Sequence, residues 1–538
     1  MDTPLNASAS SAGAVFSNSI FEVPQFQREY SWTAKEEVAE FWTDLSGSIS
    51  AEVYFLGLLI LTNENDRSHV VDGQQRIISL SLLAAALYHE AVDRGRDALA
   101  DRISAAFLKS INFDTDEKEP RVLLSFGPDN ETFQTIVDTG QAPSKMFAGD
   151  TVSSKIIESY NYLRSELKKD LKVDPFKRLG LWAEFLTKKL YFAVFLHPDP
   201  AAAYQVFEVV NTRGKELTTA DLLKNYLLSQ TKPEDRENRY NRWQSIAGNF
   251  PSEGANNFVQ YIRHVVTVHN GHVLPKDLYA FLAGRLRYQE GAPHSPTELM
   301  GLFEQNLKLY LQMIDPSAAG PATDGMLSVF SALNSLGVIA VRPMLLAIAA
   351  TADPDAGMRH VLQLVVRRIA VGSLGTGNVE RRLGEAAKKI WETEDWQAGT
   401  DSLRDLMPTR DDFTAQIAKR SYNKATLSFL RRSTIQNSMF PAKEGTLHFI
   451  CPRQADEWEG MDEDARSFWC ATIGNSFLST YNRRVAETSN WEGFKEGMLP
   501  TAIDGEFTEP LAQFEEWNVS SISSVGLDLS EKAANVWY

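Results

Sequence analysis

The stretch "VVDGQQRIISLSLLAAALYHEA", residues 70–91, decides the fold of the N-terminal part of the chain because it joins a strand to a helix through a polar corner. Val70 and Val71 end a β-rich apolar run, and Ile77 opens a long apolar run typical of a helix. The residues between them, 72–76, read "DGQQR". The first turn of a helix presents unpaired N–H groups and the positive end of the helix dipole, which favour an anion such as phosphate. The corner is therefore a candidate phosphate site.

The segments before this corner predict a small mixed domain. Residues 19–33 look extended, because Pro24 biases its neighbour away from helix and aromatic residues are dense. A helix is predicted to follow, with Thr33 as its N-cap and Glu36 at the capping-box spacing. It would place four apolar residues on one face: Val38, Phe41, Trp42 and Leu45. A predicted β-hairpin, "EVYFLGLLILTNE" followed by "RSHVV", then leads into Asp72.

A second polar island follows a mostly helical region with a late buried strand at 188–199. Within residues 204–230, Asn211 and Arg213 fall in a predicted loop, and a helix capped by Thr218 or Thr219 should carry Asp221 and Lys224. Residues 236 to about 400 read as helices without strands. The last part mixes helices with one short strand, "TLHFICP".

Composition limits the classes of protein that this chain can be. Its 538 residues are 43% hydrophobic and 23% charged, which excludes fibrous and disordered proteins. With only two cysteines, Cys451 and Cys470, a disulfide framework and a cysteine zinc site are not expected, and a reducing cytoplasm is the natural compartment. Residues 1–17 lack a secretory pattern and are expected to be a disordered lead-in. No apolar stretch approaches the ~20 residues that span a bilayer, so no membrane association is expected.

Charge and histidine spacing leave two sites to weigh. The net charge of −16 argues against a general nucleic-acid coat but leaves room for a local basic groove. His264, His269 and His272 have a spacing that could ligate zinc, yet no cysteine or ordered acid accompanies them. A helix end followed by a polar loop is the preferred interpretation. No Walker A motif occurs, so hydrolysis of the P-loop type is not expected.

Four motifs in order carry a family resemblance: "VPQFQREYSW", "YFLGLLIL", "VVDGQQR" and "VNTRGKELTTADLLKNYLL". Together they resemble the N-terminal domain of the GmrSD-type restriction proteins, the DGQQR-motif family whose fold is similar to that of ParB and sulfiredoxin. More weakly, "TLHFICPRQADEW", "IGNSFLSTYN" and "NWEGFKEGM" resemble the family's HNH-like nuclease domain. The resemblance implies an α+β chain with a ParB-like nucleotide-binding domain at 18–235, a helical domain at 236–405 and a degenerate ββα-metal-type HNH-like domain at 406–538.

What the resemblance implies for function is bacterial anti-phage defence. The chain would sense phage or modified DNA and hydrolyse a nucleoside triphosphate (GTP, ATP, UTP or CTP). It would nick or cleave DNA with a divalent metal, Mg or Mn. The implied partners, besides DNA, are further copies of the chain or a second defence protein of the same operon.

For the nucleotide site, Gly73 would let the backbone approach a ligand and Arg76 would clamp its charge, while Asp72 would hold a metal or orient water. The alternative is that Asp72 caps the helix and Arg76 pairs with a neighbouring acid. The resemblance assigns catalysis to Asp72, Gln75 and Arg76, and nucleotide binding to Gln27, Arg28, Gly73, Gln74, Asn211 and Arg213. It brings the segment with Gln27 and Arg28 against the corner.

The HNH-like segment departs from the family. The family pattern is Glu-His-x-x-Pro, and aligning its proline on Pro452 puts His448 at the acid and Phe449 at the catalytic histidine. Neighbouring residues of a strand face opposite sides, so His448 would need a bulge to replace residue 449. Asn475, Asn482 and Lys495 stand in the expected order behind it. The predicted nuclease residues are therefore His448, Asn475, Asn482 and Lys495, in a damaged or rearranged centre.

Three functions follow from these observations. The first is a defence NTPase with a DNA-directed output. The second is a non-catalytic DNA-sensing or scaffold subunit that works with an active partner nuclease. The third is a nucleotide-independent, ParB-like DNA-binding regulator.

Overall fold

The structure of the chain is a computed structural model that divides into two compact units, Met1–Asn249 and Phe250–Tyr538. Each unit is described by itself. The residues that the structure describes are 6–24, 29–64, 67–143, 151–197, 203, 206, 218–250, 255–284, 294–372, 377–453, 458, 460–481, 490–503 and 511–538.

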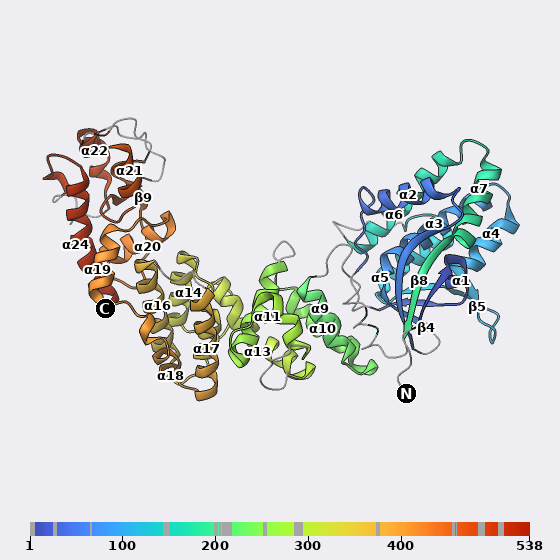
Figure 1. Ribbon diagram of the computed structural model, residues 1–538, viewed down its shortest axis with the longest axis horizontal. Coiled ribbons are helices and arrows are strands. Elements are labelled where there is room, and N and C mark those ends of the chain that lie inside the picture. Colours follow the sequence, from blue (N-terminus) through green and yellow to red (C-terminus); the bar gives the residue numbers. More distant parts are fainter. Residues whose placement is uncertain are drawn as a thin grey trace. The chain divides into compact units, whose positions relative to one another are not determined.

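The first unit is built on a six-stranded sheet with the strand order β1-β8-β3-β4-β2-β7 (Figure 1). The strands are β1 (Asn6–Ser11), β2 (Phe21–Val23), β3 (Tyr54–Glu64), β4 (Arg67–Asp72), β7 (Val122–Leu124) and β8 (Leu190–His197). β3 and β4 form an antiparallel hairpin, whereas β8 runs parallel to β3 and β2 runs parallel to both β4 and β7. The sheet is therefore mixed, as the predicted mixed α/β class requires, and is not a doubly wound parallel sheet.

Most of the elements predicted around the corner are confirmed. The hairpin, the helix α3 (Gln74–Asp93) after it and the late strand β8 all form. The helix α2 (Glu37–Ser48) buries the predicted face of Val38, Phe41, Trp42 and Leu45. Its start differs from the prediction: Glu36 is the N-cap, and Thr33 donates from its backbone N and its Oγ1 to Glu37 Oε2, at 2.9 and 3.2 Å. Residues 34–36 form a turn, so α2 begins at Glu37, later than predicted.

The expected disordered lead-in is wrong for its described part. Residues from Asn6 onward form β1 and the helix α1 (Ala12–Ser17), and β1 pairs antiparallel with β8. Ser11 caps α1, and Ala12 and Phe16 are completely buried in the main core. The small and polar residues of β1 show no apolar pattern that would predict a strand. β1 forms because it pairs with β8.

Both faces of the sheet are covered. Along β3 and β4 successive side chains point to opposite faces of the sheet. Leu59, Leu61 and Val70 lie in the large core beneath α3, and Ile60 and Val71 lie in a small cluster on the opposite face. α3 is buried nearly all round, which explains its uniformly apolar sequence. The other described elements of the unit are α4 (Asp97–Ile103), the π-helix η1 (Ser104–Leu108), β5 (Lys109–Ile111), β6 (Lys118–Pro120), α5 (Gly127–Thr139), α6 (Val152–Asp170), α7 (Pro175–Glu184), the π-helix η2 (Phe185–Lys189), α9 (Thr219–Ser229) and α10 (Pro233–Ala247).

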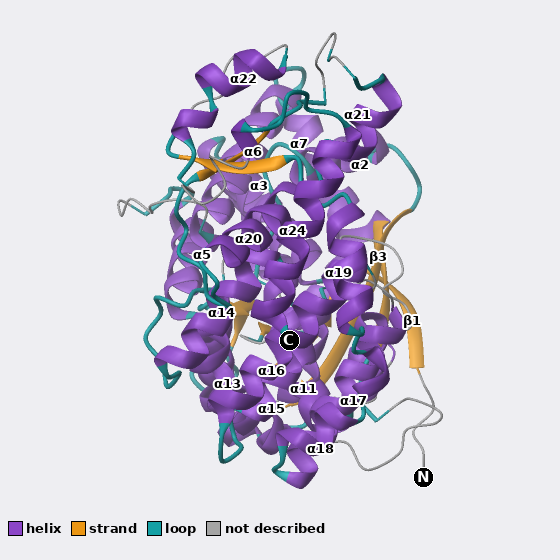
Figure 2. Cartoon of the chain, turned by 90° about the vertical axis from the view of Figure 1, so that its left-hand side faces the viewer, coloured by secondary structure: helices purple, strands orange, loops and turns teal. Residues whose placement is uncertain are grey.

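The described residues of the second unit form helices and one short hairpin (Figure 2). Its helices are α11 (Ala255–Asn270), α12 (Leu278–Leu282), α13 (Pro296–Ile314), α14 (Asp324–Leu336), α15 (Arg342–Ile348), α16 (Pro354–Val371), α17 (Gly377–Thr393), α18 (Trp396–Asp401), α19 (Arg410–Lys419), α20 (Lys424–Ile435), α21 (Glu463–Trp469), α22 (Trp491–Gly497) and α24 (Val519–Trp537). The hairpin consists of β9 (Thr446–Phe449) and β10 (Ser476–Ser479). β9 confirms the short strand predicted for the C-terminal part, whereas β10 was not predicted.

Among the helices that the structure describes, none is long and apolar enough to span a membrane.

Candidate functional site

Gly73 makes the strand-to-helix corner. It is the N-cap of α3 with a left-handed backbone, φ 95° and ψ 5°. A Cβ at this position would lie 2.2 Å from Leu59 Cδ2 on β3 and 3.2 Å from the Leu58 carbonyl oxygen. The corner therefore requires glycine for both its conformation and its close approach to β3.

The N-terminus of α3 has the properties of an anion site. The helix is 20 residues long, no side chain caps it, and its first turn holds no acidic residue. Its first N–H groups point along the axis toward the end of β4, where the helix dipole is positive. The phosphate site at the corner stays a prediction.

Arg76 lies in the first turn of α3, where a cation is unfavourable unless an anion accompanies it. Its Nη1 donates to the Leu58 carbonyl oxygen at 2.8 Å. The guanidinium also lies beside Gly57, where a Cβ would come within 3.1 Å of Arg76 Cζ. Within the described residues no carboxylate is at salt-bridge distance from Arg76, so the alternative in which it pairs with a neighbouring acid is not what the structure contains.

Asp72 ends β4 directly before this turn. Burial raises the pKa of its carboxyl, while the Arg76 charge and the Gly73 N–H act in the opposite direction. The N-cap is Gly73, so Asp72 does not cap α3. A half-buried carboxyl beside an arginine and a helix N-terminus has the surroundings of a functional acid.

Gln75 connects the corner to the first extended segment. Its Oε1 accepts from the Ser31 backbone N at 2.9 Å, and its Nε2 donates to the Glu29 carbonyl oxygen at 3.1 Å. Tyr30 between them is buried and bonds Ser79 of α3 at 2.8 Å. Residues 29–31 thus lie against the corner as the family pattern predicts. The predicted ligands Gln27 and Arg28, which immediately precede them, lie outside the described residues.

The second polar segment predicted for the nucleotide site, within residues 204–230, is described only in part. Asn211 and Arg213 lie outside the described residues. Thr218 caps α9 in a capping box with Asp221, whose backbone N donates to Thr218 Oγ1 at 3.2 Å. Asp221 Oδ1 is also 3.9 Å from the ammonium of the buried Lys224. The predicted capping of this helix by Thr218 is confirmed, whereas Asp221 and Lys224 pair within α9 itself. Gln74 is buried at the start of α3.

His448 lies on the α22 side of the β9–β10 hairpin. Its ring pairs across the strands with that of Phe477 at 5.6 Å, and Phe477 packs on Phe494 of α22 at 5.0 Å. The register runs without a shift from Thr446 to Phe449, so no bulge is present and Phe449 faces the opposite side. His448 Nε2 lies 3.0 Å from the Tyr481 carbonyl oxygen. A carbonyl only accepts, so Nε2 carries a proton and donates to it.

Asn475 is completely buried and uses its whole amide in protein contacts. Its Oδ1 accepts from Cys451 N at 3.0 Å and Trp517 Nε1 at 2.9 Å, and its Nδ2 donates to the carbonyl oxygens of Cys451 and Cys470 at 2.8 and 3.0 Å. The residue holds the turn before β10, and a catalytic role would require it to give up these bonds. Its predicted nuclease role stays a prediction.

Lys495, another predicted nuclease residue, lies on α22. Its ammonium is 2.6 Å from Glu492 Oε1 and 5.6 Å from the Trp491 ring centroid. Asn482 lies outside the described residues.

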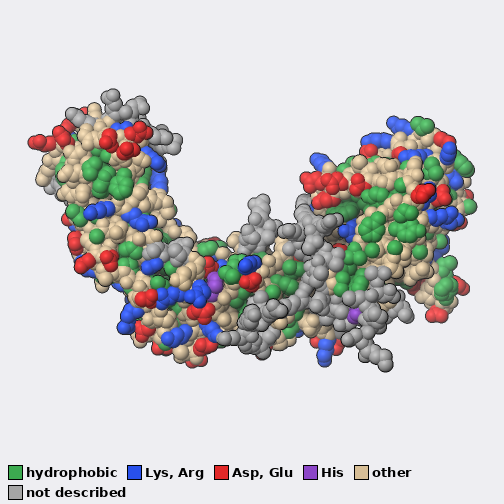
Figure 3. All heavy atoms as spheres, viewed as in Figure 1, with side chains coloured by type: hydrophobic (Ala, Val, Ile, Leu, Met, Phe, Trp, Pro, Cys, Tyr) green, Lys and Arg blue, Asp and Glu red, His purple; other side chains and the backbone are tan. Residues whose placement is uncertain are grey.

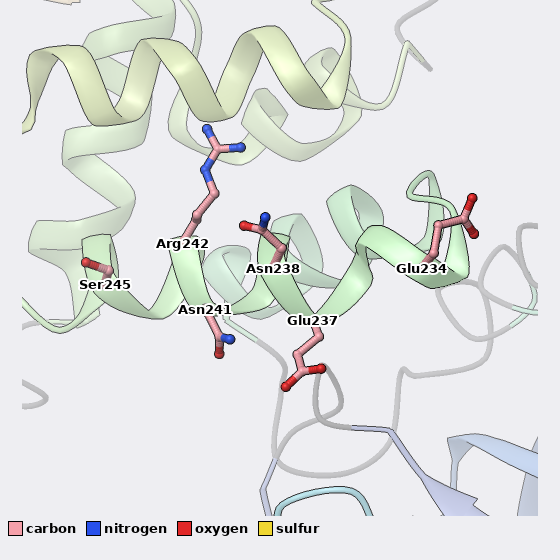
Figure 4. A pocket seen from close by; sticks show the side chains of 6 residues that line it. All are labelled: Glu234, Glu237, Asn238, Asn241, Arg242 and Ser245. Carbon is pink, nitrogen blue, oxygen red and sulfur yellow. The ribbon is translucent and has the colours of Figure 1, made fainter.

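No group of three or more His, Cys, Asp or Glu side chains is arranged to hold a metal in the part of the chain that the structure describes. The three spaced histidines do not converge: His264 bonds Tyr310, His269 packs on Trp391, and the His272 N–H donates to Glu385. A hollow of about 530 Å³ runs along α10. Its six lining side chains come from that one helix and point in different directions (Figure 4). It therefore offers no converging set of groups.

Gly57 is the site residue that the sequence analysis missed. The pairing of β3 with β8 shifts register between Phe55 and Gly57, and Gly57 has φ 132°. This irregularity makes room for the Arg76 guanidinium. A glycine inside the β-rich run "YFLGLLIL" is the signal that could have found it, since such a glycine marks a bulge or a close approach.

The comparison with known families agrees with this geometry. Residues 12–228 match the family described as GmrSD restriction endonuclease, N-terminal domain. The match begins at α1 and ends within α9, so it includes the whole corner and every sheet strand except β1. Among curated proteins no match was found. Residues 12–228 therefore form a domain similar to the N-terminal domain of the GmrSD restriction endonucleases.

Proposed function

We propose that this chain is an anti-phage defence protein of the modification-dependent restriction type, which couples nucleotide binding and hydrolysis at the β4–α3 corner to DNA nicking or cleavage. Its DNA would be phage or modified DNA. In this proposal residues 18–235 are a ParB-like nucleotide-binding domain, 236–405 a helical domain and 406–538 an HNH-like domain. The family match supports the restriction class, and the finer assignments rest on the arguments below.

The observation that carries the nucleotide proposal is the Arg76 guanidinium at an uncapped helix N-terminus, with no carboxylate within salt-bridge distance among the described residues. Helix N–H groups and a guanidinium together bind a phosphate through charge-assisted hydrogen bonds. Gly73 allows the phosphate to approach the backbone, and Arg76 is already oriented by the Leu58 carbonyl. No acid in the first turn opposes an anion there.

Asp72 fits the chemistry of a nucleotide-bound Mg or Mn, because such a metal is usually held by one or two carboxylates together with phosphate oxygens and water. A bound triphosphate with its metal would supply the scissile phosphoanhydride bond. In this proposal Asp72 orients the attacking water or holds the metal, and Gln75 keeps residues 29–31 against the corner. Gln27, Arg28, Gln74, Asn211 and Arg213 are proposed to complete the nucleotide contacts.

A second candidate, a non-catalytic DNA-sensing or scaffold subunit paired with an active nuclease, is favoured by one observation in the C-terminal part. Phe449 stands at the position of the family's catalytic histidine, and Asn475 is fully engaged in structural hydrogen bonds. The remaining base is His448, on the α22 side. In this candidate a partner chain, either another copy or a second defence protein, supplies the nuclease.

One experiment separates these functions. The purified chain is incubated with each of the four nucleoside triphosphates, with and without phage DNA, and phosphate release and plasmid nicking are measured together. Hydrolysis stimulated by DNA, with nicking, supports the first function, and hydrolysis without nicking supports the second. Nucleotide binding and DNA binding are measured by titration in the same samples; DNA binding with neither binding nor hydrolysis of any nucleotide would leave the nucleotide-independent regulator.

A further inference from the structure

A cluster of four buried polar side chains lies in the second unit, apart from both sites above. Arg263 and His264 come from α11, Tyr310 from α13 and Arg342 from the start of α15. Both arginines are 9% exposed, His264 is 2% exposed and Tyr310 is completely buried. The Arg342 guanidinium lies 5.3 Å from the Tyr310 ring centroid.

Hydrogen bonds run through this cluster in one direction. Arg263 Nη2 lies 3.5 Å from His264 Nε2, and since the guanidinium only donates, Nε2 is the acceptor. His264 Nδ1 then carries the proton and donates to the Tyr310 hydroxyl oxygen at 2.9 Å. Arg342 Nη1 donates to the same oxygen at 3.5 Å. Among the described residues, the Tyr310 hydroxyl proton has no acceptor.

The charges of the cluster are unbalanced as well. Arg263 is paired with Glu380 of α17 at 2.9 Å. Arg342 has no carboxylate within salt-bridge distance in the described part of the chain, and its second contact, from Nη2 to the Met313 carbonyl oxygen, is again 3.5 Å. Contacts of this length are weak, because good N–H···O bonds are about 2.9 Å. A buried guanidinium without an anion is costly.

We propose that Arg342, backed by Arg263, His264 and Tyr310, binds a phosphate group. Every member of the cluster donates hydrogen bonds, and what is missing is one anionic acceptor beside Arg342. A phosphate supplies several acceptor oxygens and a charge that balances the second arginine. Tyr310 holds the guanidinium in place, because its hydroxyl accepts from Arg342 Nη1 at 3.5 Å and its ring lies 5.3 Å from the guanidinium, and His264 in turn bonds Tyr310.

Charged side chains of both signs lie around the cluster. Figure 3 shows Lys and Arg mixed with Asp and Glu in the region of α17, the helix that contributes Glu380 and packs on both α11 and α15. Two cations of α17 are paired with acids, Arg382 with Asp405 and Lys388 with Glu392. The ligand is either a phosphodiester of a DNA backbone or a small phosphate compound such as a free nucleotide. This site does not depend on the β4–α3 corner.

The test uses the full chain, with Arg342→Gln as the variant and Arg404→Gln as the matched control. Arg404 belongs to the same unit, and its side chain is 81% exposed and pairs with Asp401. The probes are a fluorescein-labelled DNA duplex, ATP and inorganic phosphate, each titrated with protein that circular dichroism shows to be folded. Arg342→Gln should weaken at least one probe about tenfold or more, and Arg404→Gln should leave it within about twofold. A loss confined to DNA assigns a backbone phosphate, and a loss for ATP or phosphate assigns a small ligand.

Equal binding of every probe by the two variants would overturn the proposal and leave Arg342 as a structural clamp on α13. If Arg342→Gln does not fold, Arg342→Lys decides, because it keeps the charge and loses the planar fork. Its binding should then be several-fold weaker than that of the wild type, and unchanged binding overturns the proposal. Arg342→Gln is also made in an Arg76→Ala background. If it weakens probe binding there by the same factor, the Arg342 site is independent of the β4–α3 corner, and either proposal can then be wrong without the other.

Discussion

Gly73 shows at the scale of one residue why the corner cannot accept a side chain. Its φ of 95° is costly for any residue with a Cβ, and that Cβ would lie 2.2 Å from Leu59 Cδ2. We expect Gly73→Ala to lower the free energy of unfolding by roughly 2 to 5 kcal/mol, through backbone strain and overpacking. Gly95→Ala is the control, since its φ is 66° but nothing lies near its Cβ; it should cost about 1 kcal/mol. Chemical denaturation measures both, and equal losses would contradict the steric argument.

Arg76 is the residue on which nucleotide binding should depend most. Arg76→Ala removes a charge-assisted phosphate contact worth roughly 1.5 to 3 kcal/mol, so binding should weaken by about tenfold or more. Asp72→Asn should reduce hydrolysis more than binding. The matched control is Arg67→Ala on β4, the strand that leads to the corner, where the arginine pairs with Glu22 at 3.0 Å and is 48% exposed. Isothermal titration with each nucleotide gives the affinities, and wild-type binding by a folded Arg76→Ala protein would refute the site.

His448 and Phe449 make a paired test of the nuclease centre. We expect the chain alone to nick plasmid DNA slowly with Mg or Mn, and His448→Ala to reduce the residual rate by about 100-fold or more, as loss of a general base does. Phe449→His should not raise the rate, because residue 449 faces away from α22. A gain of nicking in Phe449→His would place the centre on the other face of the hairpin.

At the scale of elements, Gln75 ties an extended segment to the helix that follows the corner. Gln75→Ala removes the acceptor of the Ser31 N–H, so hydrogen exchange at Ser31 should accelerate by about threefold to tenfold, the value of one net hydrogen bond. Gln75→Glu keeps that acceptor and loses the donor to Glu29, so the Ser31 N–H should stay protected. Unchanged exchange in Gln75→Ala would show that Tyr30 alone holds the segment.

Elements with a strong period could be predicted from the sequence, and elements that depend on distant partners could not. The β3–β4 hairpin, α3 and β8 have long apolar runs and formed as predicted. β1 and β7 were not predicted: β1 is made of small and polar residues, and β7 has three residues. Both are edge strands whose pairing partners lie far away in the sequence.

The features of the candidate site also divide into those that could be predicted from the sequence and those that depend on distant parts of the chain. Gly73, Asp72 and Arg76 could be placed at the corner because a strand, a glycine and a helix are read locally. The contact of Arg76 with Leu58 depends on the irregular register around Gly57, which only the sheet determines. The face on which His448 lies also depends on tertiary packing, here on where α22 lies. Strand alternation alone gives two faces without saying which one is functional.

At the scale of the whole molecule, buried histidines should make stability depend on pH. Burial and the neighbouring His294 lower the pKa of His269 to about 4, and burial with Arg263 and Arg342 keeps the pKa of His264 well below its ordinary value. The two histidines bind protons near pH 6.5 in the unfolded chain but not in the folded chain. The stability that depends on their neutral form is therefore fully present above that pH and is lost as the pH falls toward 4.

For His269, which is partly exposed, we expect a loss of roughly 1 to 2 kcal/mol between pH 7 and pH 4.5, after discounting for solvent. Unfolding followed at both pH values measures it. His269→Phe keeps an aromatic ring against Trp391 and removes the titrating group, so its pH dependence should be shallower than that of the wild type. An identical slope would mean that His269 is not among the groups responsible.

The position of β8 in the sheet also determines when the sheet can be completed during translation. β8 lies between β1 and β3, so the first strand to leave the ribosome finds its neighbour only after residues 190–197 emerge. At ordinary translation rates that interval is roughly 10 to 40 s. Until then the nascent chain carries β1 unpaired and one edge of β3 open, which is the kind of exposed edge that other chains can join. The N-terminal unit therefore has a long interval of vulnerability during translation, and that interval closes when β8 is inserted.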